Sequence, residues 1–329
     1  MSATPPPAAV TLGTRASNLA RAQTDGVVEL LAAAWPDVSC DVRPIVTQGD
    51  RTQASGEPLP EIGGKGLFTL ELERALLDGE IDVAVHSLKD LPTEDAPGVV
   101  IAAVCVREDP RDCLVARDGL TLAEFPPGTV VGTSSLRREA QLRALRPALE
   151  IRSIRGNVDT RVDKVRRGEY DAAVLAAAGV RRLGVEEVVT EWLEPETMLP
   201  APGQGALAVQ CRADDERVLE LLAAMDDLAS RVTTTAERTF LRELGGGCAA
   251  PVAAHAEVVP RGADDASNSL LQGALRVRMN GLVASIDGSE VIRVRGEGEP
   301  DELGGRLARE ALAAGADGIL EAIRLGVSP

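Results

Sequence analysis

One order of segments occurs twice in this chain, and this repeat constrains the fold more than any other feature. A short apolar run leads into a glycine-threonine turn at Gly13 and again at Gly132, and a helix-like run follows each turn. Residues 79–85 (Gly-Glu-Ile-Asp-Val-Ala-Val) match residues 168–174 (Gly-Glu-Tyr-Asp-Ala-Ala-Val). The two matched segments lie further apart in the first copy, which therefore holds a longer insert. Chance similarity of short motifs is the alternative.

Strand-like runs alternate with helix-like runs through both copies. Such alternation predicts α/β lobes with parallel strands. Two similar lobes usually leave a cleft between them, and the loops after the strands face that cleft. Helix N-termini in those loops present N–H groups and the positive end of the helix dipole, so the sequence predicts a cleft that binds anions.

The pattern changes after about residue 223, where a small α+β domain is expected. Its polar loop is predicted at Gly262–Ser269. Its other elements are expected as a helix at Arg231–Leu244 stopped by Gly245-Gly246-Gly247, strands at Leu275–Met279 and Val291–Val294, turns at Asn280-Gly281 and Asp287-Gly288, and a helix at about Asp301–Ala314.

The charge balance limits the classes of partner. Lys and Arg number 35 against 51 Asp and Glu, which gives a formal net charge of −16. Such a surface disfavours nucleic acid and anionic membranes as non-specific partners. No apolar stretch is long enough to span a bilayer, and Met1–Val10 lacks the features of a signal peptide. We therefore expect a cytoplasmic protein whose residues 1–9 form a disordered tail.

Arginines stand out against this acidic background because they follow predicted strands. The groups are Arg15 in the first copy and, in the second, Arg137 with Arg138, Arg155 with Arg161, and Arg181 with Arg182. Guanidinium groups bind carboxylates and phosphates well. Each single arginine has the alternative of pairing with nearby Glu and Asp. Taken together, the set predicts a cleft for a polyanionic ligand.

A buried strand at residues 81–85 ends in the polar turn His86–Pro92. Ser87, Lys89 and Asp90 therefore stand at the carboxyl end of a strand, at the edge of the predicted cleft. A solvated turn, or a plain surface pair of Lys89 with Asp90, is the alternative.

The five cysteines are widely spaced, with no C-x-x-C pair, and the chain has two histidines. A disulfide framework and a metal site are both disfavoured. Cys248 follows three glycines and is placed for exposure, so it is a candidate reactive thiol. A Cys–His nucleophile pair with His86 or His255 stays open, although no spacing supports it.

An aperiodic region at residues 50–64 is predicted to be a flexible lid. It leads into Gly63-Gly64-Lys65-Gly66, which is not a P-loop because Gly follows the lysine.

Several segments together resemble the porphobilinogen deaminase family. The resemblance spans about residues 10 to 255 and weakens after Pro260. Its blocks are Gly13-Thr14-Arg15-Ala16-Ser17, Gly63-Gly64-Lys65-Gly66-Leu67-Phe68, His86-Ser87-Leu88-Lys89-Asp90-Leu91-Pro92, Gly132-Thr133-Ser134-Ser135-Leu136-Arg137-Arg138, Arg155-Gly156-Asn157-Val158-Asp159-Thr160-Arg161, Leu199-Pro200-Ala201-Pro202-Gly203-Gln204-Gly205 and Gly246-Gly247-Cys248.

The resemblance implies a fold and an activity. Two lobes similar to type II periplasmic binding proteins are expected, at residues 10–105 with 205–222 and at 106–204, followed by a third domain at 223–329. The implied enzyme is a monomeric transferase of tetrapyrrole and heme biosynthesis. It joins four porphobilinogen molecules on a dipyrromethane cofactor held by Cys248 through a thioether, and it releases ammonia and hydroxymethylbilane.

The resemblance also implies roles for individual residues. Asp90 is the expected catalytic group. The expected cofactor-binding residues are Cys248, Lys89, Asp90, Thr133, Ser134, Ser135, Arg137, Arg138 and Arg161. The expected substrate-binding residues are Arg15, Ser17, Lys65, Phe68, Ser87, Arg155, Arg182 and Gln204.

Two other classes of function compete with this interpretation. A binding module without catalysis shares the two lobes and the anion cleft, but it leaves Asp90 and the third domain unexplained. A transferase with Cys248 as a free nucleophile predicts that alkylating agents label this cysteine in the isolated protein, which a thioether prevents.

Overall fold

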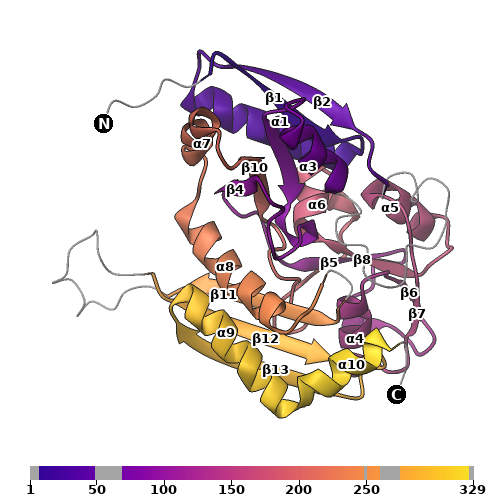
Figure 1. Cartoon of the computed structure of the whole chain (residues 1–329). Coiled ribbons are helices and arrows are strands. Elements are labelled where there is room, and N and C mark those ends of the chain that lie inside the picture. Colours follow the sequence, from indigo (N-terminus) through magenta and orange to yellow (C-terminus); the bar gives the residue numbers. More distant parts are fainter. Residues whose placement is uncertain (1–6, 49–68, 248–249, 260–274, 326–329) are drawn as a thin grey trace.

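The computed structural model describes residues 7–48, 69–247, 250–259 and 275–325. It contains three sheets, each with its own helices (Figure 1). The described residues form two α/β lobes and a C-terminal unit. Outside the described residues lie three predicted site residues, the predicted lid and one predicted loop: Lys65, Phe68, Cys248, residues 50–64 and Gly262–Ser269.

The two lobes have the same strand order. Lobe one has the order β2-β1-β3-β10-β4 and lobe two has the order β7-β6-β8-β5-β9. The strands of lobe one are β1 (Ala9–Arg15), β2 (Ser39–Ile45), β3 (Val83–Ser87), β4 (Val99–Val104) and β10 (Leu207–Arg212), with helices α1 (Asn18–Ala34), α3 (Leu70–Leu77) and α7 (Glu216–Ala223). Those of lobe two are β5 (Asp112–Ala116), β6 (Val130–Gly132), β7 (Glu150–Arg152), β8 (Ala172–Ala176) and β9 (Glu191–Leu193), with α4 (Leu136–Leu145), α5 (Val158–Arg166) and α6 (Ala177–Arg182).

The structure confirms the repeat seen in the sequence, beginning with its glycines. Gly13 on β1 pairs in parallel with β3, and Gly132 on β6 pairs in parallel with β8 at the matching place. A Cβ at Gly13 would overlap the Ile81 side chain, and one at Gly132 would lie 3.0 Å from Tyr170. Ile81 and Tyr170 occupy the same place in the two matched segments, so both turns use glycine for the same steric reason.

The aspartates of the repeat also have one shared role. The Asp82 carboxylate accepts a hydrogen bond from the Thr11 backbone N–H at 2.9 Å. The Asp171 carboxylate accepts one from the Val130 N–H, also at 2.9 Å. Each aspartate therefore ties the start of one central strand to its parallel neighbour.

The prediction of parallel sheets needs a correction, because both sheets are mixed. β10 pairs antiparallel with β3 and β4, and β5 pairs antiparallel with β8 and β9. Both exceptional strands come directly after the chain has crossed between the lobes. The first crossover runs from β4 to β5 (residues 105–111) and the second from β9 to β10 (residues 194–206).

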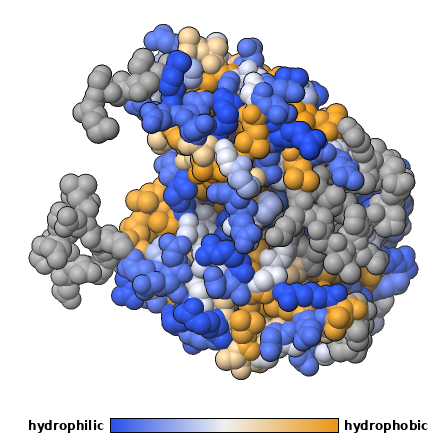
Figure 2. Space-filling view, viewed as in Figure 1, coloured by the Kyte–Doolittle hydropathy of each residue, from blue (hydrophilic) through white to orange (hydrophobic). Residues whose placement is uncertain are grey.

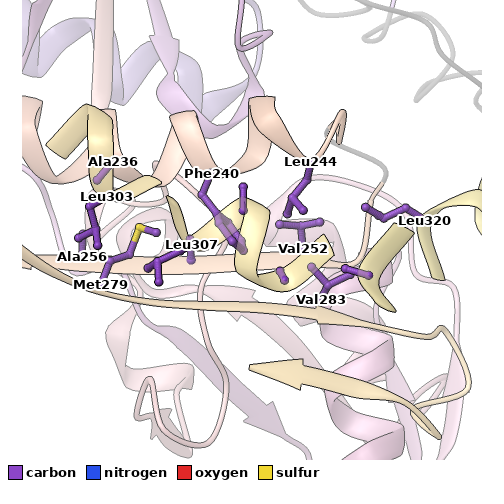
Figure 3. Packing of buried hydrophobic residues seen from close by; sticks show 14 of the residues in the cluster. Ala236, Phe240, Leu244, Val252, Ala256, Met279, Val283, Leu303, Leu307 and Leu320 are labelled. Atoms are coloured by element: carbon purple, nitrogen blue, oxygen red, sulfur yellow. The ribbon is translucent and has the colours of Figure 1, made fainter. Parts of the chain in front are cut away.

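The C-terminal unit is a three-stranded antiparallel sheet with helices packed on it. Phe240, on the helix Leu228–Glu243, is fully buried and packs in one cluster with Leu303 and Leu307 of the helix Pro300–Ala311 (Figure 3). The elements are α8 (Leu228–Glu243), β11 (Val252–Val258), β12 (Val277–Ala284), β13 (Val291–Gly298), α9 (Pro300–Ala311), a π-helical stretch (Leu312–Ala316) and α10 (Asp317–Arg324).

The turn predicted at Asn280-Gly281 is wrong, because both residues lie inside β12. A Cβ at Gly281 would lie 2.7 Å from Cζ of Phe240. This glycine therefore lets the aromatic ring reach the sheet, and the turn falls later, where Gly288 has a φ of +74°.

Close packing of α8 on α9 gives a first testable prediction. A Cβ at Gly304 would overlap the Ala236 carbonyl oxygen, whereas one at Gly305 meets only the flexible ends of Arg309 and Glu243. We expect Gly304→Ala to lower the free energy of unfolding by about 1–3 kcal/mol. The control Gly305→Ala is expected to leave it unchanged or raise it by up to about 1 kcal/mol, because alanine favours helices. Urea unfolding of both variants measures the difference, and equal stabilities would contradict the packing described.

Hydrophilic residues are spread over the described part of the face shown in Figure 2, with small groups of hydrophobic residues between them. Among the described helices, none has the length and apolar character needed to cross a membrane.

Candidate active site

A cavity of about 270 Å³ lies where the two lobes and the second crossover meet. The ends of β1, β3 and β8 reach it, as do the first turns of α1 and α5, which agrees with a site at the carboxyl ends of parallel strands. Its lining includes Arg15, Ser17, Gln23, Ser87, Lys89 and Asp90 from lobe one, Arg138, Asn157, Arg161 and Arg182 from lobe two, and Gln204 from the second crossover.

The cavity carries an excess of positive charge. Among the described residues, five cationic side chains line it, against the single carboxylate of Asp90. Burial, reinforced by the neighbouring Arg138 charge, lowers the pKa of Arg161 to about 10. Burial lowers the pKa of Lys89 to about 8, although the Asp90 carboxylate opposes the shift. Cations that repel one another in this way indicate a site for a ligand with several negative charges.

Among the described residues that line the cavity, Arg138 alone has a buried side-chain donor without a partner. It is 5% exposed, and its Nη1 donates to the Val174 carbonyl at 2.8 Å while its Nη2 donates to Asp112 at 2.7 Å. Its Nε is buried and has no partner among the described residues. A buried donor without a partner is costly, and a ligand carboxylate would satisfy it.

Arg137 lies behind the cavity rather than in its lining. Its Nη1 donates to Asp112 at 2.8 Å and to the Leu199 carbonyl at 2.6 Å. It therefore connects α4 to the second crossover, beside Arg138.

Arg181 and Arg182 separate, although both follow the same predicted strand. Arg182 lines the cavity and donates to the Gly205 carbonyl at 2.7 Å. Arg181 lies 3.3 Å from both Asp109 and Glu186, and its guanidinium is 5.0 Å from the centre of the Trp192 ring. The alternative of pairing with nearby acids is therefore correct for Arg181.

Gln204 is 1% exposed and joins separate parts of the site. Its Oε1 accepts a hydrogen bond from Lys89 Nζ at 3.2 Å, and its Nε2 donates to Asp112 at 2.8 Å. The same amide donates to the Pro110 carbonyl at 2.8 Å. It was predicted to line the path of the substrate, and the structure adds that it connects the two crossovers.

The remaining predicted residues lie near the starts of two helices. Ser17 is the N-cap of α1 and accepts from the Ala20 N–H at 3.3 Å. The Thr133 hydroxyl accepts from the Ser135 N–H at 3.2 Å, and Ser134 donates to the Ile154 carbonyl at 2.7 Å. These hydroxyls shape the turn before α4. Arg155 is half-buried at the turn before α5, outside the cavity lining.

Three residues of the site escaped the sequence analysis. Asp112 is the buried acid that Arg137 and Arg138 share. Gln23 donates to the Ser87 hydroxyl at 2.9 Å, and Asn157 lines the cavity at the N-cap of α5. A charged residue at the start of the apolar run Asp112–Ala116 was the one available signal for Asp112.

The described histidines and cysteines are poorly suited to nucleophilic catalysis. Burial, with help from the Arg15 charge, lowers the pKa of His86 to about 4, and burial also lowers the pKa of His255. Burial raises the pKa of Cys105 to about 11 and that of Cys113 to about 12. These thiols stay protonated at neutral pH.

Fold and site together define a class: a two-lobed α/β protein whose described residues line a cavity with cations and one carboxylate, suited to a small polyanion. Comparison with known proteins then narrows the class. Residues 10–220 match a family model described as porphobilinogen deaminase, dipyromethane cofactor binding domain, and residues 232–313 match the C-terminal domain of the same family. The chain belongs to the porphobilinogen deaminase family.

Similar proteins agree over nearly the whole length. A porphobilinogen deaminase of Mycolicibacterium gilvum is 50% identical, over 95% of this chain and 98% of its own. One of Roseiflexus castenholzii is 49% identical, over 94% and 98%. Among solved structures, the methionine binding protein MetQ matches with a TM-score of 0.42 and 10% identity, over 68% of this chain and 92% of its own.

Proposed function

We propose that the cavity between the lobes is the active site at which this chain joins four porphobilinogen molecules head to tail. Ammonia leaves at each step, and the linear product hydroxymethylbilane is released by water at the end. One observation carries this proposal: among the described residues that line the cavity, Asp90 is the single carboxylate beside five cations.

The cations match the chemistry of the substrate. Porphobilinogen bears one acetate and one propionate group, so every unit added to the chain brings two carboxylates. Lys89, Arg138 and Arg161 are the residues we assign to the carboxylates of the cofactor. Arg15 and Arg182, which also line the cavity, are assigned to the incoming substrate. Charge-assisted hydrogen bonds of this kind fix both position and orientation.

The described residues fit a dipyrromethane cofactor, because among them Arg138 Nε has no partner and the cations of the cavity outnumber its carboxylates. Cys248 is the residue we assign to its covalent attachment, through a thioether. When bound, the cofactor supplies the free pyrrole carbon from which the chain grows.

Asp90 is assigned the catalytic role. Loss of ammonia from porphobilinogen leaves a positive charge that is shared between the methylene carbon and the pyrrole nitrogen. A carboxylate held beside the pyrrole N–H stabilises that charge more in the transition state than in the ground state. The same carboxylate can accept a proton that leaves the ring. The Lys89 ammonium is placed to bind a neighbouring acetate or propionate.

The two adjacent arginines of α6 give a matched test of this assignment. Arg182→Gln removes a cation from the cavity and is expected to raise KM for porphobilinogen about tenfold, the usual value of one charged hydrogen bond. Arg181→Gln removes the same charge one residue away, outside the lining, and is expected to leave KM within about twofold. Initial rates over a range of substrate concentrations measure both. Equal effects of the two changes would exclude Arg182 from substrate binding.

The proposal includes a monomer that acts in the cytoplasm on a small molecule. The net charge of −16 supports the absence of a nucleic-acid partner. Light scattering of the purified protein tests the monomer directly.

Turnover is the decisive experiment for the function. The purified chain is incubated with porphobilinogen, and ammonia and the tetrapyrrole product are measured together. Four substrate molecules consumed per product, with equal release of ammonia, support the proposal. Binding of porphobilinogen without its consumption would favour the binding-module alternative. A binding module carries no attached pyrrole, so the purified protein alone would then give no colour with Ehrlich's reagent.

A further inference from the structure

We propose that Asp112 is a positioning residue of this site, which fixes the N–H donors that Arg138 and Gln204 present. It touches neither substrate nor cofactor in this proposal. The inference rests on the function proposed above, in which the cations of the cavity bind carboxylates.

The hydrogen bonds of Asp112 carry the proposal. The residue is 0% exposed at the start of β5. Its Oδ1 accepts from Arg138 Nη2 at 2.7 Å and from Gln204 Nε2 at 2.8 Å, and its Oδ2 accepts from Arg137 Nη1 at 2.8 Å. Both carboxylate oxygens are therefore committed to side chains from other elements. A buried carboxylate with this many donors is held rigidly.

Arg138 shows what the arrangement achieves. A guanidinium has five N–H donors in one plane, and Asp112 and the Val174 carbonyl take donors from its two Nη atoms. Its Nε is buried and has no partner among the described residues. Asp112 therefore holds the guanidinium through Nη2, and in this proposal the Nε donor is left for a ligand carboxylate.

Gln204 extends the same control to lobe one. Its Nε2 is held by Asp112 and by the Pro110 carbonyl of the first crossover, so its Oε1 has one available direction. That oxygen accepts from Lys89 Nζ at 3.2 Å. A path of hydrogen bonds thus runs from Asp112 in lobe two, through the second crossover, to the lysine beside Asp90.

The charge of Asp112 matters as well as its shape. Arg137 and Arg138 are adjacent and buried, and without the carboxylate their charges would repel each other in a medium of low dielectric. For the Lys89 ammonium, Asp90 and Asp112 raise the pKa, whereas Arg138 and Arg137 lower it together with burial. The other charged groups lining the same cavity are Arg15, Arg161 and Arg182. Loss of the Asp112 charge therefore favours the neutral amine of Lys89.

The test is Asp112→Asn, which keeps the shape and removes the charge. Its control is Glu237→Gln, since Glu237 is also 0% exposed and bonded to an arginine, at 2.8 Å from Arg107. That pair lies outside the cavity lining and, among the described residues, it contacts the site only through backbone groups: Arg107 donates to the Gln204 carbonyl at 2.8 Å, and Glu237 accepts from the Gly203 N–H at 2.7 Å. Two quantities are measured for the complete chain: the dependence of kcat/KM on pH, and the rate at which cofactor-free protein gains two pyrrole units by intact mass when porphobilinogen is added.

We expect Asp112→Asn to move the alkaline limb of the pH profile to lower pH by up to about one unit, because Asp112 is one of the opposite charges that raise the pKa of Lys89. We also expect a slower gain of the two units. Glu237→Gln is expected to lower the melting temperature and leave the alkaline limb in place. An Asp112→Asn protein with the wild-type limb and the wild-type mass gain would overturn the proposal.

A second variant covers the case in which Asp112→Asn does not fold. Gln204→Leu cuts the path to Lys89 and keeps the buried charge, so KM is expected to rise about tenfold with the alkaline limb in place. An unchanged KM would overturn the proposal. Failure of the wild-type protein to turn over or gain mass would instead refute the proposed function, so the two failures are distinguishable.

Discussion

Cys248→Ser is expected to abolish turnover and to remove a mass excess of two linked pyrrole units from the purified protein. Nucleophilic attack requires the thiolate, and a serine hydroxyl stays protonated at neutral pH, so no stable primer forms. The expected loss of kcat is more than about a thousandfold, since one covalent site carries every round of synthesis. Intact mass spectrometry beside an activity assay measures both effects.

Cys40→Ser is the matched control for that experiment. Cys40 is a partly exposed thiol whose pKa burial raises, with a further increase from Asp41, so it is a poor nucleophile. Its serine variant is expected to keep both the mass excess and the activity. A Cys248→Ser protein that carries the full excess would show that the cofactor is attached elsewhere. Rapid alkylation of Cys248 in the wild-type protein as isolated would favour the transferase with a free cysteine nucleophile.

Asp90→Asn is expected to lower kcat by about 10²- to 10⁴-fold, the usual contribution of a positioned acid or base. The amide keeps the size and one hydrogen-bonding oxygen but loses the charge that stabilises the cation formed from the substrate. KM is expected to change little, because the carboxylates of porphobilinogen are bound by Arg15 and Arg182 in our assignment. Single-turnover measurements of ammonia release isolate this step.

Asp90→Glu provides the comparison, because it restores the charge at a displaced position. We expect a partial recovery of the rate over Asp90→Asn. Near-normal ammonia release by the asparagine variant, with an unchanged circular dichroism spectrum, would remove Asp90 from the mechanism.

The repeat made the architecture predictable from sequence because it marks structural necessities. Gly13 and Gly132 have no room for a side chain, and Asp82 and Asp171 bond equivalent strands. The antiparallel direction of β5 and β10 left no local signal, because the sequence pattern of a strand does not depend on the direction of its neighbour. The direction of those two strands was therefore missed.

Individual side chains of the site were less predictable than the place of the site. Arg181 and Arg182 are consecutive in a helix, so they point about 100° apart, and only one can face the cavity. Asn280-Gly281 is a strong local signal for a turn, but both residues lie inside β12. The glycine is needed there because the Phe240 ring occupies the space that a side chain would fill. The sequence predicted Lys89 and Asp90 correctly as residues of the cavity, because both directly follow a buried strand whose carboxyl end lies at the cavity.

The return of the chain from lobe two to lobe one, where it adds β10, has a consequence for synthesis on the ribosome. Lobe two runs uninterrupted from Asp112 to Leu193, so all of its strands are available once that stretch has emerged. Lobe one begins earlier but needs β10, which ends at Arg212, to join β3 to β4. A nascent chain would usually fold its first domain first. Here the order is reversed, because the lobe that is translated first is completed second. Until β10 has been translated, β3 and β4 each present an unpaired edge that a chaperone or a neighbouring nascent chain can reach.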